Sequence, residues 1–307
     1  MSFIETLLTG NNEKERKNKA ACAAAIVITA ILLVIAIIAF SICQIIDSTP
    51  AGPNDADDLD REIEVEPKEF GDEKVKEGLL VTLDDDHPYL IRITPTNLQK
   101  RDDRPKTSEK DENGNPVNAY TVQGRANSTL ATTEETGKEL NKMLTAFYSA
   151  VKDDNLIIEN AYDTAKEGTQ DAIFSAGTAV EFKYFSRDEN GKFIRNPIVG
   201  AATYKWLYNN AHKYGFIAIS SDSNIFRYVG VPFATAIKTS GLSFDAFIAK
   251  LKNATWENPV FLDSNKNYAT YYCPINEVVV PTNYQWTTDG DNAGGVYVTV
   301  NFTAPIN

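Results

Sequence analysis

Near its N-terminus, the chain contains one long, uninterrupted stretch of hydrophobic residues. Residues 20–46 contain no charged side chain and few polar ones. At about 1.5 Å per residue, a helix of this length would cross a hydrocarbon core of about 30 Å with some tilt. A cleaved signal peptide has an apolar region of only about 7–15 residues and a small-residue cleavage site. The pattern therefore predicts an uncleaved signal-anchor, with one transmembrane helix over 20–46.

The charges on either side of this stretch predict its orientation. Lysine and arginine precede it closely within residues 1–19, and aspartates follow it from Asp47 onward. Because positively charged flanks stay on the cytoplasmic side, we expect residues 1–19 to be a cytoplasmic tail. The rest of a single-pass protein in the cell membrane would then be extracellular. Residues 47–74 are acidic, contain prolines and lack periodicity, which predicts an extended linker.

From residue 75 to residue 252, helical and strand periodicities alternate. Apolar side chains recur at helical spacing, and short runs of aromatic and β-branched residues lie between them. The expected helices cover 140–151, 202–213 and 243–252, and the expected strands cover 156–158, 178–184, 216–219 and 225–229. This order predicts an α+β fold, with a small antiparallel sheet and packed helices.

The pattern changes again after residue 253. Strand-like runs cover 268–273, 277–280 and 295–302, and no helical spacing accompanies them. Residues 253–307 are therefore expected to form a β-rich extension. A segment of this size is marginal as an independent domain, so we expect it to dock on the domain before it.

Composition and charge exclude some classes of binding partner and of metal site. The formal net charge is -12, which argues against nucleic acid, because nucleic-acid binding rewards basic surfaces. Cys22 and Cys43 lie in the apolar stretch, and Cys273 is the one cysteine beyond it. This exterior part therefore has neither a disulfide framework nor a cysteine-based zinc site.

Two short segments carry a family resemblance. Residues 172–181 (AIFSAGTAVE) and 222–230 (DSNIFRYVG) resemble the S-x-H-x-x-G-x-A-x-D and E-x-W-H-x-R-Y-V-G motifs of VanY-type D-alanyl-D-alanine carboxypeptidases, which are zinc peptidases of the LAS type. Residues 86–89 (DHPY) and 206–217 (WLYNNAHKYGFI) are similar to further parts of that family. The resemblance covers roughly 75–252 and implies a VanY-like fold in a bacterial protein.

The resemblance implies a zinc site from which most functional groups are missing. The family's two histidine ligands fall on Phe174 and Ile225, and its aspartate ligand falls on Glu181. Its catalytic glutamate falls on Asp222, and the arginine that binds the substrate carboxylate falls on Asp163. Phenylalanine and isoleucine offer a metal no lone pair. We therefore expect no metal at Phe174, Glu181 and Ile225, and no zinc cofactor.

The function expected from this resemblance is non-catalytic. The domain would be a pseudopeptidase that binds a peptidoglycan stem peptide or a wall-assembly protein. Its possible remnant cleft consists of Tyr162, Asp163, Glu181, Asp222 and Arg227. One alternative is an active D,D-carboxypeptidase with a non-standard metal site, in which Asp222 stands at the general-base position. Another is an interaction or adhesion module that uses the fold as a spacer. His87 and His212 lie outside both metal-site motifs and are expected to be structural or exposed.

Overall fold

The computed structural model describes residues 62–84, 87, 95–110, 112–118, 129–166 and 169–306. The chain divides into two compact units, 1–61 and 62–307. The predicted tail, the predicted transmembrane helix and the first part of the predicted linker lie outside the described residues. No helix within the described ranges combines the length and the apolarity needed to cross a bilayer.

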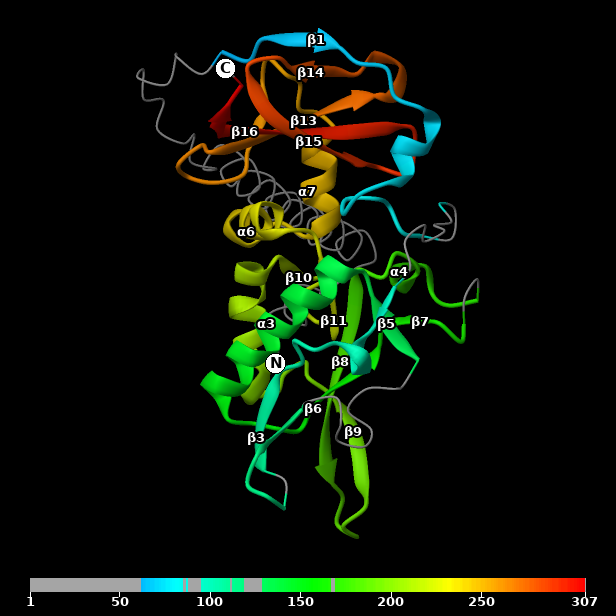
Figure 1. Ribbon diagram of the computed structural model, residues 1–307, viewed down its shortest axis with the longest axis vertical. Coiled ribbons are helices and arrows are strands. Elements are labelled where there is room, and N and C mark those ends of the chain that lie inside the picture. The colour runs from blue at the N-terminus through cyan, green and yellow to red at the C-terminus, as the bar shows by residue number, and fades with distance from the viewer. Residues whose placement is uncertain are drawn as a thin grey trace, which may run out of the picture. The chain divides into compact units, whose positions relative to one another are not determined.

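An antiparallel sheet forms the centre of the second unit (Figure 1). Its strands follow the order β10-β11-β8-β6, and β9 continues beside β8. The bounds are β6 Leu156–Asn160, β8 Ala179–Arg187, β9 Phe193–Pro197, β10 Phe216–Ala218 and β11 Ile225–Tyr228. The mixture of helices with a small antiparallel sheet confirms this part of the predicted fold class.

Alternation along the strands gives this sheet two different faces. Val180 and Phe182 on β8, and Phe226 on β11, point into the main core. The intervening residues, Ala179 and Glu181 on β8 and Ile225 and Arg227 on β11, lie on the opposite face. We call this second side the site face, because it carries the positions singled out by the two motifs.

Helix α3 (Glu134–Val151) packs on the core face. Thr133 caps its N-terminus by accepting a hydrogen bond from the backbone N–H of Thr136. Its buried apolar side chains are Leu140, Met143, Leu144, Phe147 and Tyr148. The apolar spacing thus identified this helix correctly, because those positions form one continuous stripe.

The predicted helix over 202–213 consists of three shorter pieces. A 3-10 turn, η3 (Ala202–Tyr204), leads into α5 (Lys205–Asn210), and a second 3-10 turn, η4 (Ala211–Tyr214), ends the segment. Gly215 follows with φ of 81°, a left-handed conformation that favours glycine at a helix end. The spacing of side chains fits both helix types over a few residues, so sequence periodicity alone does not separate them.

Two further helices follow β11. α6 (Val231–Ser240) was not expected, whereas α7 (Phe244–Leu251) falls within the predicted 243–252 and begins at the predicted cap, Ser243. Ser243 accepts a hydrogen bond from the backbone N–H of Ala246. Both helices bury apolar residues in a second core, which includes Ile217 of β10.

The C-terminal part contains a four-stranded sheet of order β12-β13-β16-β15. Its strands are β12 Val260–Phe261, β13 Tyr268–Pro274, β15 Tyr284–Gly290 and β16 Gly295–Pro305. The 3-10 turn η5 (Ile275–Glu277) precedes β14 (Val279–Pro281), which pairs with β1 (Val65–Pro67). Strand structure therefore dominates residues 260–305.

Part of the range expected to be a linker is ordered against this C-terminal sheet. Residues 65–67 form β1, and residues 72–76 form the 3-10 turn η1 (Asp72–Lys76). Ile63, Val65 and Phe70 join the apolar core beneath strands β13 and β16. These apolar residues are too widely spaced among acidic ones to produce a periodic signal, which is why the segment resembled a linker.

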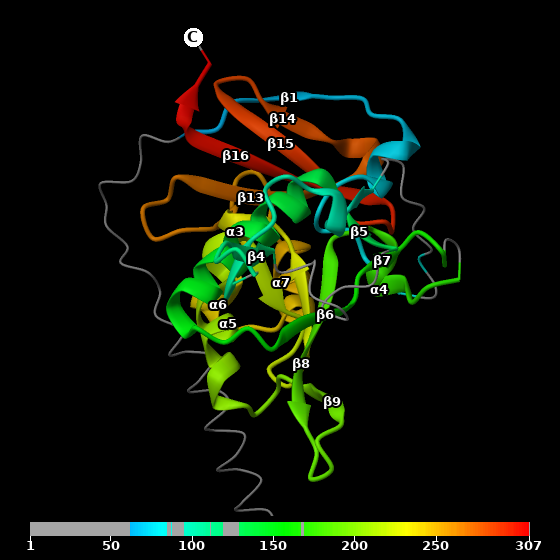
Figure 2. The ribbon, with the colours of Figure 1, turned by 60° about the horizontal axis from the view of Figure 1, so that its bottom comes forward.

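Small pieces of sheet complete the fold (Figure 2). A three-stranded sheet has the order β2-β5-β7, and a two-stranded ribbon pairs β3 with β4. These strands are β2 Thr96–Asn97, β3 Lys106–Lys110, β4 Pro116–Asn118, β5 Leu130–Thr132 and β7 Tyr162–Asp163. The turn η2 (Leu98–Lys100) and the short helix α4 (Ala172–Ser175) lie at the ends of this region.

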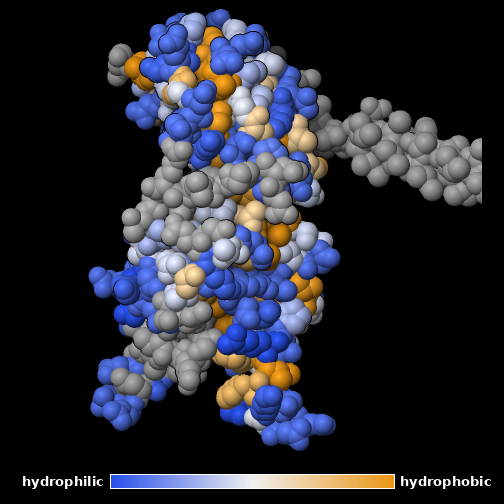
Figure 3. Space-filling view, turned by 90° about the vertical axis from the view of Figure 1, so that its right-hand side faces the viewer, coloured by the Kyte–Doolittle hydropathy of each residue, from blue (hydrophilic) through white to orange (hydrophobic). Residues whose placement is uncertain are grey.

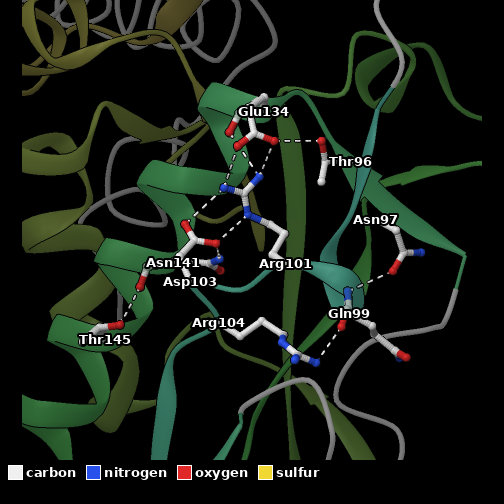
Figure 4. A network of polar contacts seen from close by, with 9 residues as sticks. All are labelled: Thr96, Asn97, Gln99, Arg101, Asp103, Arg104, Glu134, Asn141 and Thr145. Carbon is white, nitrogen blue, oxygen red and sulfur yellow. Dashed lines mark hydrogen bonds and ion pairs between the residues drawn. The ribbon is translucent and has the colours of Figure 1, made fainter.

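A buried arginine joins this region to the start of α3 (Figure 4). Arg101 is 6% exposed, and its guanidinium donates to both carboxylate oxygens of Glu134, at 2.9 and 3.1 Å. It also donates to both oxygens of Asp103, at 2.9 and 3.1 Å. Asn141 and Thr96 donate to the same two carboxylates. This network is structural, because each of its charged groups is already engaged by a neighbour.

Candidate functional site

Strands β8 and β11 place two of the motif positions side by side. In the antiparallel register Glu181 lies directly opposite Ile225, and Ala179 lies opposite Arg227. Directly opposite residues point to the same face and have Cβ atoms about 4.5–5.5 Å apart. The sheet therefore brings Glu181 and Ile225 together on the site face, at positions to which the resemblance assigned metal ligands.

The carboxylate of Glu181 is engaged by its neighbours on the sheet. The side-chain amide of Asn160 donates a hydrogen bond to Oε2, and Lys183 Nζ lies 3.9 Å from Oε1. Lys183 also lies 3.5 Å from Glu159, which accepts a hydrogen bond of 2.9 Å from Arg195. Amide and ammonium groups thus surround the carboxylate from within the chain.

Phe174 lies on α4, whose residues contact β7 and β8. Its side chain is 4% exposed. The backbone N–H of Gly177 donates to the Phe174 carbonyl at 3.0 Å, and Gly177 has φ of 66°. The motif glycine is therefore needed for the turn that leads from α4 into β8, because side chains other than glycine rarely adopt this conformation.

Asp222 lies in an exposed turn before β11. Its Oδ1 accepts a hydrogen bond of 2.8 Å from the hydroxyl of Ser220. Burial, and secondarily the charge of Asp222, raises the pKa of Tyr208 to about 12. The Tyr208 ring packs on Phe226, whose side chain belongs to the core face. The structure thus gives the two carboxylates of the alternative metal site different environments.

Tyr162 and Asp163 lie on β7, in a different sheet from Glu181. Both side chains are buried, with Asp163 7% exposed. Asp163 Oδ1 accepts the backbone N–H of Ala165 at 3.0 Å, and Lys166 Nζ lies 3.9 Å from Oδ2. Its carboxylate therefore stabilises a local turn, at the position where the family places an arginine for the substrate.

Arg227 has a structural role at the bottom of the site face. The residue is 2% exposed, and Nη2 donates to the carbonyls of Leu79 at 2.9 Å and Val81 at 2.6 Å. Its guanidinium also lies 4.7 Å from the centre of the Phe244 ring. Arg227 therefore joins the segment before the site to β11 and to α7.

A pocket of about 470 Å³ lies beside Arg227. It is lined by Thr82 and Leu83, by Ile173 of α4, by Arg227, and by Phe244 and Ile248 of α7. Asp84 and Asp245 add two carboxylates to the lining. Of the remnant-cleft residues named from the sequence, Arg227 is the one that lines this pocket. The motifs did not indicate that Phe244 and Ile248 of α7 belong to this site, although their helical spacing predicted that they lie on a buried face of a helix.

The side chains at the three ligand positions do not fit a zinc ion. Zinc sites in proteins are built from imidazole, thiolate and carboxylate groups. Phe174 and Ile225 have no donor atom, and Glu181 alone supplies a carboxylate. Within the described ranges, no three or more histidine, cysteine, aspartate or glutamate side chains gather closely enough to hold a metal ion.

The two histidines lie in other places. His87 Nδ1 is 2.6 Å from Asp84 Oδ1, next to the pocket. His212 is half-buried in η4, where burial and the charges of Lys238 and Lys213 lower its pKa. It lines a separate cavity between η4, β10 and α6.

Comparisons with known proteins support one fold. No family profile matches the sequence. A D-alanyl-D-alanine carboxypeptidase of Enterococcus faecium is 24% identical over 261 residues, which are 76% of this chain and 78% of that protein. The solved structure of VanXYg, a vancomycin resistance D,D-dipeptidase, superposes with a TM-score of 0.53 at 16% identity, over 78% of this chain and 99% of the other. The chain has the VanY-type peptidase fold.

Within this VanY-type fold, the resemblance seen in the motifs is confirmed at the level of architecture. A structure of VanYB with D-alanine-D-alanine aligns at 16% identity over 57% of this chain and 99% of the other, and its TM-score of 0.36 adds nothing to the fold assignment. The motif glycines and the Arg227-to-Gly230 run lie in the turns and strands described above. The VanY-type scaffold is thus present around a set of side chains that does not suit zinc.

Proposed function

We propose that this protein is a catalytically inactive member of the peptidoglycan-peptidase class, which binds cell-wall peptide without a metal. The pairing of Glu181 with Ile225 carries this proposal. Hydrolysis by a zinc peptidase needs a metal to activate water and polarise the scissile carbonyl. Of the three positions that should supply metal ligands, two carry the hydrocarbon side chains of Phe174 and Ile225. The proposal therefore includes the loss of zinc.

The pocket beside Arg227 is the part of the fold that we assign to the ligand. Ile173, Phe244 and Ile248 supply apolar contact for short aliphatic side chains such as those of alanine. Asp84 and Asp245 place two carboxylates in the lining of this pocket, and like charges would repel a terminal carboxylate of the ligand. The favoured ligand is therefore an internal stretch of stem peptide rather than a free D-alanyl-D-alanine terminus.

Attachment to the cell membrane through residues 20–46 is also part of the proposal. The support is the uncharged length of this stretch and the basic residues before it. An anchored domain on the outer side would face the wall directly. A tagged full-length protein should remain in the membrane fraction after an alkaline wash, and its C-terminus should be digested by protease added to intact cells. Release by the wash, or protection from protease, would contradict the anchor or its orientation.

Elemental analysis together with an activity assay tests the loss of catalysis. The full-length chain, purified in detergent, is incubated with zinc, desalted, and supplied with a wall pentapeptide. We expect substoichiometric zinc and no release of D-alanine above the rate without protein. Stoichiometric zinc with turnover would overturn the proposal and favour an active carboxypeptidase built on Glu181 and Asp222.

Peptide binding is tested in the pocket itself. Titration of the full-length protein with a soluble stem tetrapeptide should show saturable binding, weakened about fivefold by Phe244→Ala. Phe261→Ala is the matched control, because Phe261 is an exposed ring on β12, outside this pocket. No binding by the parent chain, or equal affinities for both variants, would favour the spacer hypothesis.

A further inference from the structure

The hairpin of β8 and β9 extends past the rest of the central sheet and presents an unusual row of side chains. Its strands are paired so that Phe185 lies opposite Arg195, and Arg187 lies opposite Phe193. Figures 1 and 2 both show the hairpin projecting away from the helices. These four residues are in phase with Glu181, so they continue the site face outward.

Aromatic and guanidinium groups alternate along this row, which we call the hairpin ladder. The Arg187 guanidinium lies 4.0 Å from the centre of the Phe193 ring, and the Phe193 and Phe185 ring centres are 5.6 Å apart. The Arg195 guanidinium lies 5.8 Å from the Phe185 ring. Phe193 is 58% exposed, more than any other large hydrophobic side chain in the described part of the chain. At this lower end of the molecule, Figure 3 shows apolar and hydrophilic surface side by side.

One cation of the ladder is available to a ligand, in a chain whose formal net charge is -12. Arg195 already donates to Glu159, and Lys183 lies near Glu159 and Glu181. Arg187 is exposed and forms no ion pair with a carboxylate of the described residues. A guanidinium pairs with a carboxylate through two parallel hydrogen bonds, and an aromatic face offers a flat apolar surface. The ladder therefore suits a polymer that carries both carboxylates and the flat faces of sugar rings.

We propose that the hairpin ladder binds a carboxylate-bearing glycan strand of the cell wall, while an attached peptide reaches the pocket beside Arg227. This inference rests on the proposed function, because the pocket supplies the second point of contact. Continuity of the two surfaces along one sheet face is the structural reason for joining them. The ladder would then increase the affinity for intact polymer, and this increase would not be seen when binding of a free stem peptide is measured.

An anionic membrane surface suits the ladder less well. The turn at the end of the hairpin contains Asp188 and Glu189, which would approach the lipid headgroups first. The exposed Ile194 points to the opposite face from Phe193, since the two are adjacent on a strand. The apolar side chains therefore do not form a single wedge for insertion.

Sedimentation with purified, insoluble peptidoglycan tests the ladder. The full-length protein in detergent is compared with Arg187→Gln/Phe193→Ala and with Lys192→Gln, which removes a positive charge from the same hairpin outside the ladder. We expect the double variant to bind about tenfold more weakly, and the control to bind within about twofold of the parent. Equal melting temperatures for all three proteins exclude a folding defect, because these side chains are exposed.

Each outcome separates the ladder from the pocket. Weaker polymer binding by the double variant, with unchanged affinity for soluble tetrapeptide, supports the ladder. If the double variant also binds peptide-stripped glycan strands more weakly than the parent does, the glycan carboxylates are the groups that the ladder binds. Equal polymer binding by the double variant and the parent overturns the ladder and leaves the pocket proposal standing. Binding to vesicles that contain anionic phospholipid, lost in the double variant while peptidoglycan binding persists, overturns it in favour of a membrane contact. Absence of binding to both peptide and polymer refutes the proposed function and the ladder together.

Discussion

Glu181 on β8 and Ile225 on β11 lie directly opposite each other across an antiparallel strand pair. One side chain carries a carboxylate held by Asn160 and approached by Lys183, and the other carries only hydrocarbon. In a metal centre, facing side chains of this kind would contribute their donors to the same ion. Here the pair instead combines a charge-compensated carboxylate with an apolar neighbour.

Restoring donors at these positions should create a zinc site. The variant Phe174→His/Ile225→His places one imidazole opposite Glu181 and a second on α4, which contacts β8, and we expect it to bind about one zinc per chain. Zinc at about 100 times its dissociation constant would stabilise the fold by about 2.7 kcal/mol, measured as a rise in melting temperature. Ile225→His alone is the control and should bind zinc far more weakly, since it leaves only two donors. Equal zinc binding by the single and double variants would show that position 174 does not face this site.

Removing Arg227 should strongly destabilise the domain. Arg227→Met keeps much of the apolar stem but leaves the buried carbonyls of Leu79 and Val81 without their donor. An unsatisfied buried group costs about 1–3 kcal/mol, so a loss of about 2–4 kcal/mol in the free energy of unfolding is expected for the two together. Urea denaturation measures it. Arg195→Met, at an exposed arginine, should change stability by less than about 1 kcal/mol. A similar small change for Arg227→Met would contradict the structural role.

The Arg101 network predicts a loss of stability at acid pH. The hydrogen bond from Arg101 lowers the pKa of Asp103, and the hydrogen bonds from Thr96 and Arg101 lower the pKa of Glu134. Their contribution is present above the ordinary carboxyl pKa of about 4 and is lost as pH falls through the lowered values. Asp103→Asn should therefore lower stability at neutral pH and flatten its acid dependence. Urea midpoints measured between neutral and acid pH test this, and parallel curves for parent and variant would contradict it.

A glycine inside α3 should resist replacement. A Cβ at Gly137 would lie 2.9 Å from Arg101 Nη1 and 2.7 Å from Thr132 Oγ1. In an open helix, glycine to alanine stabilises by about 1 kcal/mol. Here we expect Gly137→Ala to lower the melting temperature, because the buried guanidinium would have to move. Gly71→Ala, where nothing lies within 4 Å of the added Cβ, should be close to neutral. A rise in melting temperature for Gly137→Ala would show that the network can adapt.

Elements with strong local signals were predictable from the sequence. The apolar stripe of α3, the Ser243 cap of α7 and the alternation in β8 each follow from neighbouring residues alone. α6 was missed although its buried residues Phe233, Ala234, Ala236 and Ile237 follow helical spacing, because the helix has only 10 residues and begins with a proline in its first turn. The order of motifs also predicted the fold, since turn glycines such as Gly177 mark its connections.

The candidate site was only partly predictable. The sequence placed Glu181 and Ile225 in separate motifs, and the β8–β11 register brought them together. It assigned Asp222 and Glu181 to one possible centre, whereas the structure gives them different surroundings. The pocket beside Arg227 draws on the segment at Thr82, on α4 and on α7, which are distant along the chain.

By itself, the sequence determined which residue types stand at each motif position, and therefore that histidine nitrogens are absent from positions 174 and 225. It also determined the helices and strands whose periodicity is local. Only the tertiary structure decided that β1 pairs with β14, that Arg227 binds the carbonyls of Leu79 and Val81, and that the hairpin ladder continues the site face. Periodicity records which side of an element is buried, whereas strand register and long-range hydrogen bonds depend on which distant segment packs against that side.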